Sequence, residues 1–232
     1  MNKGKFYGVG VGPGDPRLLT LRAVEVLQSV DIVAIPKSRL DRESVAWEIA
    51  REHCRAETKL LELEMPMTSD QDVLLEAWRA GAEAVLSRLN QGLKVAFITI
   101  GDPSLYSTYS HLLQFLRPEL APEQIETVPG ISAMSAAAAR IHEPLALGDE
   151  PLLILPGTDN LERFLDLPNL VILKVSRTLP EVKASLEDSE RKAVLFTRIG
   201  QTGEDIRTLD DLDPSGKIDY LSLLLVKMGG KQ

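Results

Sequence analysis

The sequence predicts an α/β protein built from two lobes, each with a mostly parallel sheet. Strand-length apolar runs alternate with stretches of helical periodicity, which is typical of right-handed βαβ units. The run LKVAFITI at 93–100 is nearly all apolar, as expected for a strand buried on both faces of a sheet. The segment RPELAPE at 117–123 has two prolines and no periodicity, so we place the domain boundary there. The expected lobes are 1–117 and 124–232, with a ligand cleft between them.

Composition and charge restrict the possible functions. Of the 232 residues, 44% are hydrophobic, which is ample apolar material for a core. The 34 acidic and 26 basic residues give a net charge of −8, which disfavours a non-specific nucleic-acid binder. The single cysteine, Cys54, excludes an intrachain disulfide and fits a cytoplasmic setting. The first residues do not resemble a signal peptide, no apolar run is long enough to span a bilayer, and the three dispersed histidines predict no metal site.

The first lobe is expected to contain four strands and four helices in alternation. Thr20 is the predicted N-cap of the first helix and Ser69 that of the third, which Gly92 is expected to end. The expected strands are 6–11, 31–35, 59–64 and 93–100. The expected helices are 21–27, 44–51, 70–91 and 104–116.

The second lobe is expected to start again with a short strand at 125–128. A run of small residues at 136–139 predicts a helix that packs closely against its neighbours, with Ser132 as its candidate N-cap. Further strands are expected at 152–155, 170–175, 193–199 and 221–227.

Glycines at alternate positions follow the first strand, in the segment GVGVGPGD at 8–15. Glycine permits positive φ angles and lets a ligand approach the backbone closely. The spacing departs from the dinucleotide-binding pattern G-x-G-x-x-G, Pro13 removes an amide that could bind phosphate, and the next helix begins late. The segment is therefore either a ligand loop of another kind or a tight turn.

Two further segments follow strand ends, where open α/β sheets bind ligands. In GDPSLY at 101–106, Asp102 could accept hydrogen bonds from hydroxyls or an amine, but a helix cap at Ser104 with a proline turn explains the pattern equally well. In VPGISA at 128–133, free amides near Ser132 could meet a ligand, although a closely packed helix is at least as consistent with the spacing.

Together these segments resemble the tetrapyrrole methyltransferases, the S-adenosylmethionine-dependent enzymes of cobalamin and sirohaem synthesis. The resemblance covers nearly the whole chain and is strongest to the branch that methylates C-20 of precorrin-2 or its cobalt complex. The segments that carry it are GVGVGPGDPRLLTLR at 8–22, GDPSLYSTYSHL at 101–112, PGISAMSAAAA at 129–139 and PLALGDEPLLILPG at 144–157.

The resemblance implies a class III methyltransferase-like fold, commonly a homodimer, with S-adenosylmethionine bound between the lobes. The residues implied to line the donor site are Gly101, Asp102, Leu105, Ser132, Ala133, Leu155, Pro156, Ile199 and Gly200. The loop formed by Gly12, Pro13, Gly14 and Asp15 would then face the tetrapyrrole acceptor. The sequence does not assign a catalytic base: Asp15 and Tyr106 are candidates, and substrate-assisted transfer or water is an equal alternative.

An acceptor of this branch carries many carboxylates, so a net acidic protein needs local cations to bind it. The candidates are Arg17, Lys37, Arg39 and Arg42, because basic side chains, and arginine forks above all, suit carboxylates. For the last three, a solvated loop is an equally good explanation.

Two alternative functions remain open. One is methylation of another acceptor, either uroporphyrinogen III or an RNA ribose, of which the RNA is disfavoured by the net charge of −8. The other is a non-catalytic tetrapyrrole carrier. Neither a nucleic acid nor a membrane is expected as a partner.

Overall fold

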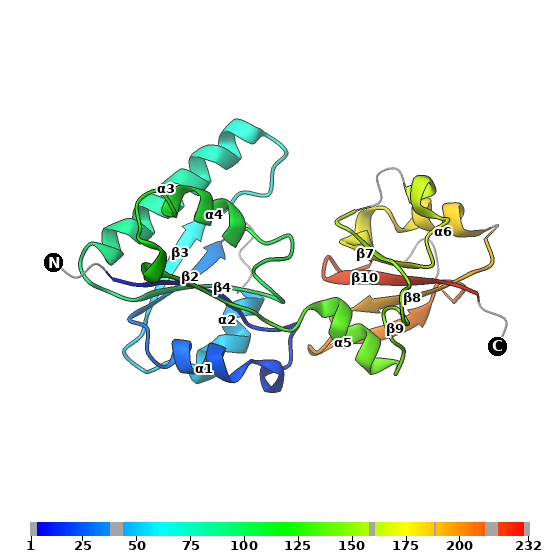
Figure 1. Ribbon diagram of the computed structural model, residues 1–232, viewed down its shortest axis with the longest axis horizontal. Helices are drawn as coiled ribbons and strands as arrows, with labels where there is room; N and C mark the ends of the chain where they lie inside the picture. Colours follow the sequence, from blue (N-terminus) through cyan, green and yellow to red (C-terminus); the bar gives the residue numbers. More distant parts are fainter. Residues whose placement is uncertain (1–3, 38–43, 158–160, 188, 212–217, 230–232) are drawn as a thin grey trace. The chain divides into compact units, whose positions relative to one another are not determined.

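The computed structural model describes residues 4–37, 44–157, 161–187, 189–211 and 218–229 (Figure 1). Contacts between residues divide the chain into two compact units, 1–132 and 133–232. Each unit contains one five-stranded sheet with helices on both faces. No helix in the described ranges is both long and apolar enough to cross a membrane.

The first sheet is entirely parallel and has the strand order β3-β2-β4-β1-β5. Its strands are β1 (Phe6–Gly10), β2 (Ile32–Lys37), β3 (Lys59–Glu64), β4 (Val95–Thr99) and β5 (Ile125–Val128). The connecting helices are α1 (Leu21–Leu27), α2 (Val45–Ala50), α3 (Gln71–Leu89) and α4 (Tyr109–Leu116). The predicted alternation of strands and helices is therefore confirmed for this unit.

Side chains along the central strands point alternately to the two faces of the first sheet and pack into two hydrophobic cores, one on each face. On β1, Tyr7 and Val9 pack with α1 and α2, whereas Phe6 packs with α3 and α4. Figure 1 shows these helix pairs on opposite faces of the sheet. Because both faces are covered, the central strands β1 and β4 are buried along almost their whole length, as the apolar run at 93–100 predicted.

Helix starts agree only in part with the predicted caps. Thr20 caps α1 as expected, because its side chain accepts a hydrogen bond from Ala23 N at 3.1 Å. The predicted cap at Ser69 is wrong, since Asp70 caps α3 by accepting from the N–H groups of Asp72 and Val73. The helix predicted to begin at residue 104 begins only at Tyr109, as α4, because turns and bends occupy residues 103–108.

The second sheet has the strand order β6-β7-β10-β8-β9. Its strands are β6 (Leu152–Leu155), β7 (Asn169–Leu173), β8 (Arg191–Thr197), β9 (Asp205–Thr208) and β10 (Ser222–Met228). Helix α5 (Ala133–Arg140) packs on one face and α6 (Leu179–Glu187) on the other. The sequence prediction did not include α6 or β9.

The second sheet corrects one prediction. Only β6 and β7 pair in parallel, whereas β10 lies between β7 and β8 and runs antiparallel to both. The pairing of β8 with β9 is antiparallel as well. An apolar run shows that a strand is buried but not which way it runs, so the expectation of a mostly parallel sheet is wrong for this unit.

The division between the units differs from the expected boundary at 117–123. Strand β5 pairs in parallel with β1, from Phe6 opposite Ile125 to Val9 opposite Val128, so it belongs to the first sheet. The proline-rich segment is therefore a loop inside the first unit, and the division follows Ser132.

A carboxylate on β5 anchors the edge of the first sheet and predicts a pH dependence of stability. Glu126 accepts hydrogen bonds from Arg22 Nε and Lys5 Nζ, both at 2.7 Å. The bond from Arg22, followed by that from Lys5, lowers the pKa of Glu126 from 4.5 to about 2. A carboxyl group with a lowered folded-state pKa stabilises the fold above its unfolded pKa and loses that contribution as the pH falls through the folded one.

We therefore expect Glu126→Gln to lower the free energy of unfolding by about 1 kcal/mol at pH 7, because the pair is partly solvated. The difference from the native protein should shrink as the pH falls from 4.5 toward 2. Urea denaturation at a series of pH values measures it. An equal difference at pH 7 and pH 2 would contradict the assigned pKa.

Candidate functional site

The loops after β1, β4 and β5 meet at one edge of the first sheet, because the three strands are parallel. Val11 N donates to Thr99 O at 2.9 Å, and Gly101 N donates to Gly12 O at 2.7 Å. Gly12 and Gly101 thereby form an isolated antiparallel bridge. The three segments that the sequence singled out therefore lie together.

Two glycines, Gly10 and Gly130, let the backbones of these loops touch. A Cβ atom on Gly130 would lie 2.1 Å from the carbonyl oxygen of Gly101 and 2.9 Å from the carbonyl carbon of Gly10. A Cβ atom on Gly10 would lie 2.5 Å from the same Gly101 oxygen. No side chain fits at these crossings, so glycine is required here for contact between backbones and not for binding phosphate.

Asp102 links the loop after β4 to the loop after β5 through its carboxylate. Its Oδ2 accepts from Gly130 N at 2.9 Å, and its Oδ1 accepts from Ser104 N at 2.8 Å and from the Ser104 hydroxyl. Partial burial alone would raise the pKa of Asp102, but these hydrogen bonds outweigh it and hold the pKa below its usual value. Asp102 is therefore an anion at neutral pH, with both oxygens bound to donors of the protein.

Gly101 is buried and packs beside Ser132. Its φ is 71°, and a Cβ atom there would meet nothing nearer than Ser132 Cα at 3.9 Å. Leu105 is half-buried, and its N–H donates to Asp102 O at 3.3 Å. Backbone groups of Gly101, the Leu105 side chain and the Ser132 segment thus lie close together at this sheet edge, and this mixture of polar and apolar groups suits a nucleoside donor such as S-adenosylmethionine.

Most of the loop after β1 is buried, which limits its direct contact with an acceptor. Gly12, Pro13 and Gly14 are all buried, and Gly12 has a φ of 77°. Asp15 accepts from Arg17 N at 2.9 Å and from Arg17 Nη2 at 2.6 Å, which caps the short 3-10 helix at 16–18. Because Asp15 and Arg17 form an ion pair, Arg17 contributes less positive potential toward an acceptor than the sequence suggests.

Tyr106 combines backbone strain with an accessible side chain. Its φ is 50°, a left-handed value that is unfavourable for a residue with a Cβ, and the residue is 49% exposed. Strained backbone of this kind clusters at functional sites. Tyr106 therefore stays a candidate for contact with a substrate.

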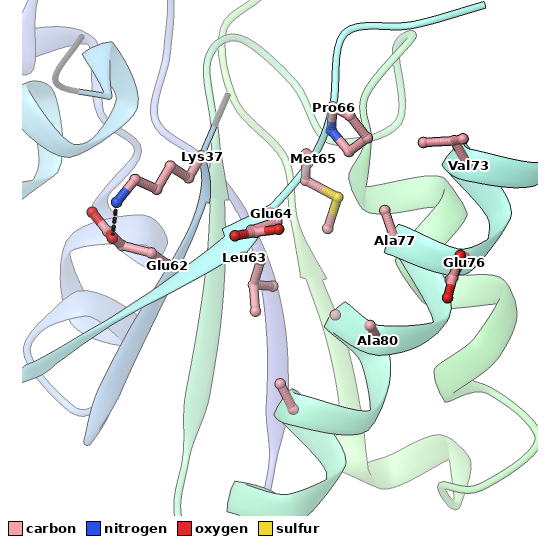
Figure 2. Close-up of a pocket in the computed structure, with 12 residues that line it drawn as sticks. Lys37, Glu62, Leu63, Glu64, Met65, Pro66, Val73, Glu76, Ala77 and Ala80 are labelled. Atoms are coloured by element: carbon pink, nitrogen blue, oxygen red, sulfur yellow. Dashed lines mark hydrogen bonds and ion pairs between the residues drawn. The ribbon is translucent and has the colours of Figure 1, made fainter. Parts of the chain in front are cut away.

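Lys37, at the end of β2, lies at the rim of a cavity of about 490 Å³ between β3 and α3 (Figure 2). Its Nζ donates to Glu62 Oε2 at 2.5 Å, so its charge is paired. Glu64 and Glu76 also line this cavity, beside apolar side chains such as Met65. This acidic lining opposes a polycarboxylate ligand, so we do not place the acceptor there.

Arg39 and Arg42, the other two candidates for the acceptor, lie outside the described residues. Among the residues that are described, no three His, Cys, Asp or Glu side chains are grouped so that they could hold a metal ion.

The second unit carries the remaining donor candidates at the start of α5 and after two strands. Strands β6, β7 and β8 run in the same direction, so their carboxyl ends lie at one edge. Leu155 is buried at the end of β6, and Pro156 follows it on the surface. Ile199 is buried in the loop after β8, where Gly200 has a φ of 75°. Ala133, the first residue of α5, is half-buried.

A carboxylate that the sequence did not single out holds the loop after β8. Glu204 Oε2 accepts from Gly200 N at 2.6 Å, and Glu204 Oε1 accepts from Arg140 Nε at 2.7 Å. The bond from Arg140 is the main cause of a lowered pKa for Glu204. Arg140 ends α5, so this pair fixes the loop to that helix. The two residues are far apart in the sequence and carry no local signal of the contact.

Comparison with known proteins identifies the family. Residues 5–213 match the family model of the tetrapyrrole (corrin/porphyrin) methylases. The chain is 37% identical to a Methanocaldococcus jannaschii protein named "Probable cobalt-precorrin-2 C(20)-methyltransferase", over 96% of each chain. It is 31% identical to the cobalt-precorrin-2 C(20)-methyltransferase of Salmonella typhimurium, again over 96% of each.

A solved structure supports the fold. The crystal structure of a cobalt precorrin-4 methyltransferase superimposes with a TM-score of 0.75 at 21% identity, covering 96% of this chain and 94% of that one. The family model and the near full-length relatives carry the assignment. The chain therefore belongs to the tetrapyrrole (corrin/porphyrin) methylase family.

Proposed function

We propose that this protein transfers a methyl group from S-adenosylmethionine to C-20 of precorrin-2 or of its cobalt complex, a step of cobalamin biosynthesis. The observation that carries the proposal is near full-length identity of 31–37% to proteins named as C(20)-methyltransferases of this substrate. The convergence of Gly101, Asp102 and Ser132 at one sheet edge supports the donor site.

The donor supplies a methyl group on a sulfonium, and a nucleophilic carbon of the acceptor displaces a neutral thioether. The acceptor is electron-rich, so the task of the protein is alignment. Orientation of two reactants supplies roughly 7–11 kcal/mol of a barrier in favourable cases. In this proposal, the backbone at Gly101 and the Ser132 segment position the donor, together with Ala133, Leu155, Pro156, Ile199 and Gly200 of the second unit.

The proton that leaves the methylated carbon or its conjugated system needs an acceptor, for which Asp15 and Tyr106 are the candidates. Both carboxylate oxygens of Asp15 accept hydrogen bonds from Arg17. Tyr106 is half exposed and follows the Asp102 turn. Accessibility therefore favours Tyr106, and Asp15 serves as the cap of its own loop.

The polycarboxylate acceptor is proposed to bind beside the loop after β1, whose residues Gly12, Pro13 and Gly14 shape the surface from below, with cations from Arg39 and Arg42. We expect Arg39→Glu or Arg42→Glu to raise the KM for the acceptor about tenfold, because a charge-assisted hydrogen bond becomes a repulsion. The dissociation constant of S-adenosylhomocysteine should not change.

Steady-state kinetics measures the KM for the acceptor, and calorimetry measures the dissociation constant of S-adenosylhomocysteine. Arg163→Glu, an exposed site in the second unit, is the matched control and should leave both unchanged. Unchanged acceptor KM in both test variants would remove the cationic segment from the proposal.

The proposal includes a cytoplasmic setting and a homodimer. The single cysteine and the family resemblance support them. Sedimentation velocity of the purified protein tests the dimer, for which a mass of twice 25.5 kDa is expected.

The activity itself is tested by incubating the protein with the donor and each acceptor under anaerobic conditions. Mass spectrometry should show one added methyl group on precorrin-2, on its cobalt complex, or on both, and comparing the two turnovers identifies the natural acceptor. Binding of the acceptor without any methyl gain would favour the carrier. Methylation of uroporphyrinogen III in preference would favour the other branch of the family.

A further inference from the structure

Asp102 occupies the point where two loops of the proposed donor site cross. The loop after β4 carries Gly101 and Leu105, and the loop after β5 carries Ser132. The two loops approach each other closely enough that a Cβ on Gly130 would lie 2.1 Å from Gly101 O. A side chain that holds the loop after β5 against the loop after β4 therefore also sets the geometry of the proposed donor site.

The carboxylate of Asp102 is hydrogen-bonded to both loops, once to the loop after β5 and twice to its own. Its Oδ2 accepts from Gly130 N at 2.9 Å, while its Oδ1 accepts from Ser104 N at 2.8 Å within its own loop. The Ser104 hydroxyl donates to Oδ1 as well. A carboxylate bound to backbone N–H groups on both oxygens has a fixed orientation, since rotation would break bonds on both sides.

We infer that Asp102 is a positioning residue: its carboxylate holds the Gly130–Ser132 segment against the Gly101 turn, and it acts on the donor through that segment. This inference rests on the proposed function. It differs from a role as a direct ligand of the donor's hydroxyls or amine, which the residue type alone suggests.

The two roles predict different effects of Asp102→Asn. Asparagine keeps the shape but has only one acceptor oxygen, which we expect to face the two donors of Ser104, so that its NH₂ group faces Gly130 N–H. Loss of the Gly130 bond frees the whole segment, which weakens every donor-like ligand by the same factor. Loss of a direct contact weakens only those ligands that carry the contacted group.

The experiment measures dissociation constants by calorimetry for S-adenosylhomocysteine, its 2′-deoxy analogue and 5′-methylthioadenosine, which lacks the amino-acid portion. Asp102→Asn should weaken all three about tenfold. Ser104→Ala removes only the hydroxyl bond and should weaken them less than about threefold. Ser110→Ala, exposed on α4, is the matched control and should change none.

Hydrogen exchange at the Gly130 amide is measured on the same variants. Asp102→Asn should speed that exchange, and Ser110→Ala should not. The melting temperature is recorded in parallel, because a merely structural role would lower it and leave the three affinities unchanged.

Three results would overturn the inference. They are a loss confined to ligands with one particular group, unchanged Gly130 exchange, and unchanged affinities despite faster exchange. If the native protein binds none of the three ligands, the proposed function fails instead, and the Gly130 exchange still reports whether Asp102 holds the segment.

Discussion

Gly130→Ala is expected to destabilise the first unit by about 3 kcal/mol or more. The added Cβ would lie 2.1 Å from the Gly101 carbonyl oxygen and 2.9 Å from the Gly10 carbonyl carbon. Overpacking in a core normally costs about 1–3 kcal/mol, because side chains can rotate away. Here the clashing atoms belong to the backbone and cannot rotate away. The clash can be removed only if the loop after β5 moves away from the sheet edge.

Urea denaturation measures this loss, and binding of S-adenosylhomocysteine should be lost with it. Gly157→Ala is the matched control, because a Cβ there would meet no atom within 4 Å. Its stability should stay within about 0.5 kcal/mol of the native value. Equal stability of the two variants would show that the three loops do not cross as described.

Gly8→Ala is expected to cost about 2–3 kcal/mol, because its Cβ would lie 2.1 Å from Cε2 of the Tyr109 ring. The ring cannot simply withdraw. It is 2% exposed, and its hydroxyl lies 2.5 Å from Thr127 Oγ1 on β5. The variant therefore has to break this polar contact or displace α4 from the sheet.

A second substitution separates this clash from other causes. Tyr109→Leu alone should destabilise by about 2–4 kcal/mol, mainly through lost packing of the buried ring. In the Gly8→Ala background the smaller side chain also removes the clash. The double variant should therefore be more stable than the sum of the two single effects predicts, by about 1 kcal/mol or more. Strict additivity in chemical denaturation would contradict the assigned contact.

Local pattern was sufficient for most strands and helices, because burial and periodicity are local properties. It failed where the structure depends on which strands pair and in which direction they run. RPELAPE looks like a linker, yet β5 returns to pair with β1, and no local feature encodes that register. The apolar run of β10 shows that it is buried, but only its hydrogen bonds to β7 and β8 show that it is antiparallel.

The candidate site shows the same limit. Glycine-rich loops after the strands could be recognised, and the structure brings those of the first unit together at one edge. The partners of the charged side chains could not be foreseen. Lys37 pairs with Glu62, and Arg140 pairs with Glu204, through contacts between residues distant in sequence. A cationic residue in a loop therefore says little about the charge that a ligand meets until its partners are known.

Transfer of an isotopically labelled methyl group tests the central claim most directly. The protein is incubated anaerobically with S-adenosylmethionine labelled with ¹³C in its methyl group, together with precorrin-2 or its cobalt complex, and the product is examined by NMR. One labelled methyl group attached to C-20 is the result that the assignment requires. A label at any other ring position, or unlabelled macrocycle recovered from protein that binds S-adenosylhomocysteine, would contradict it.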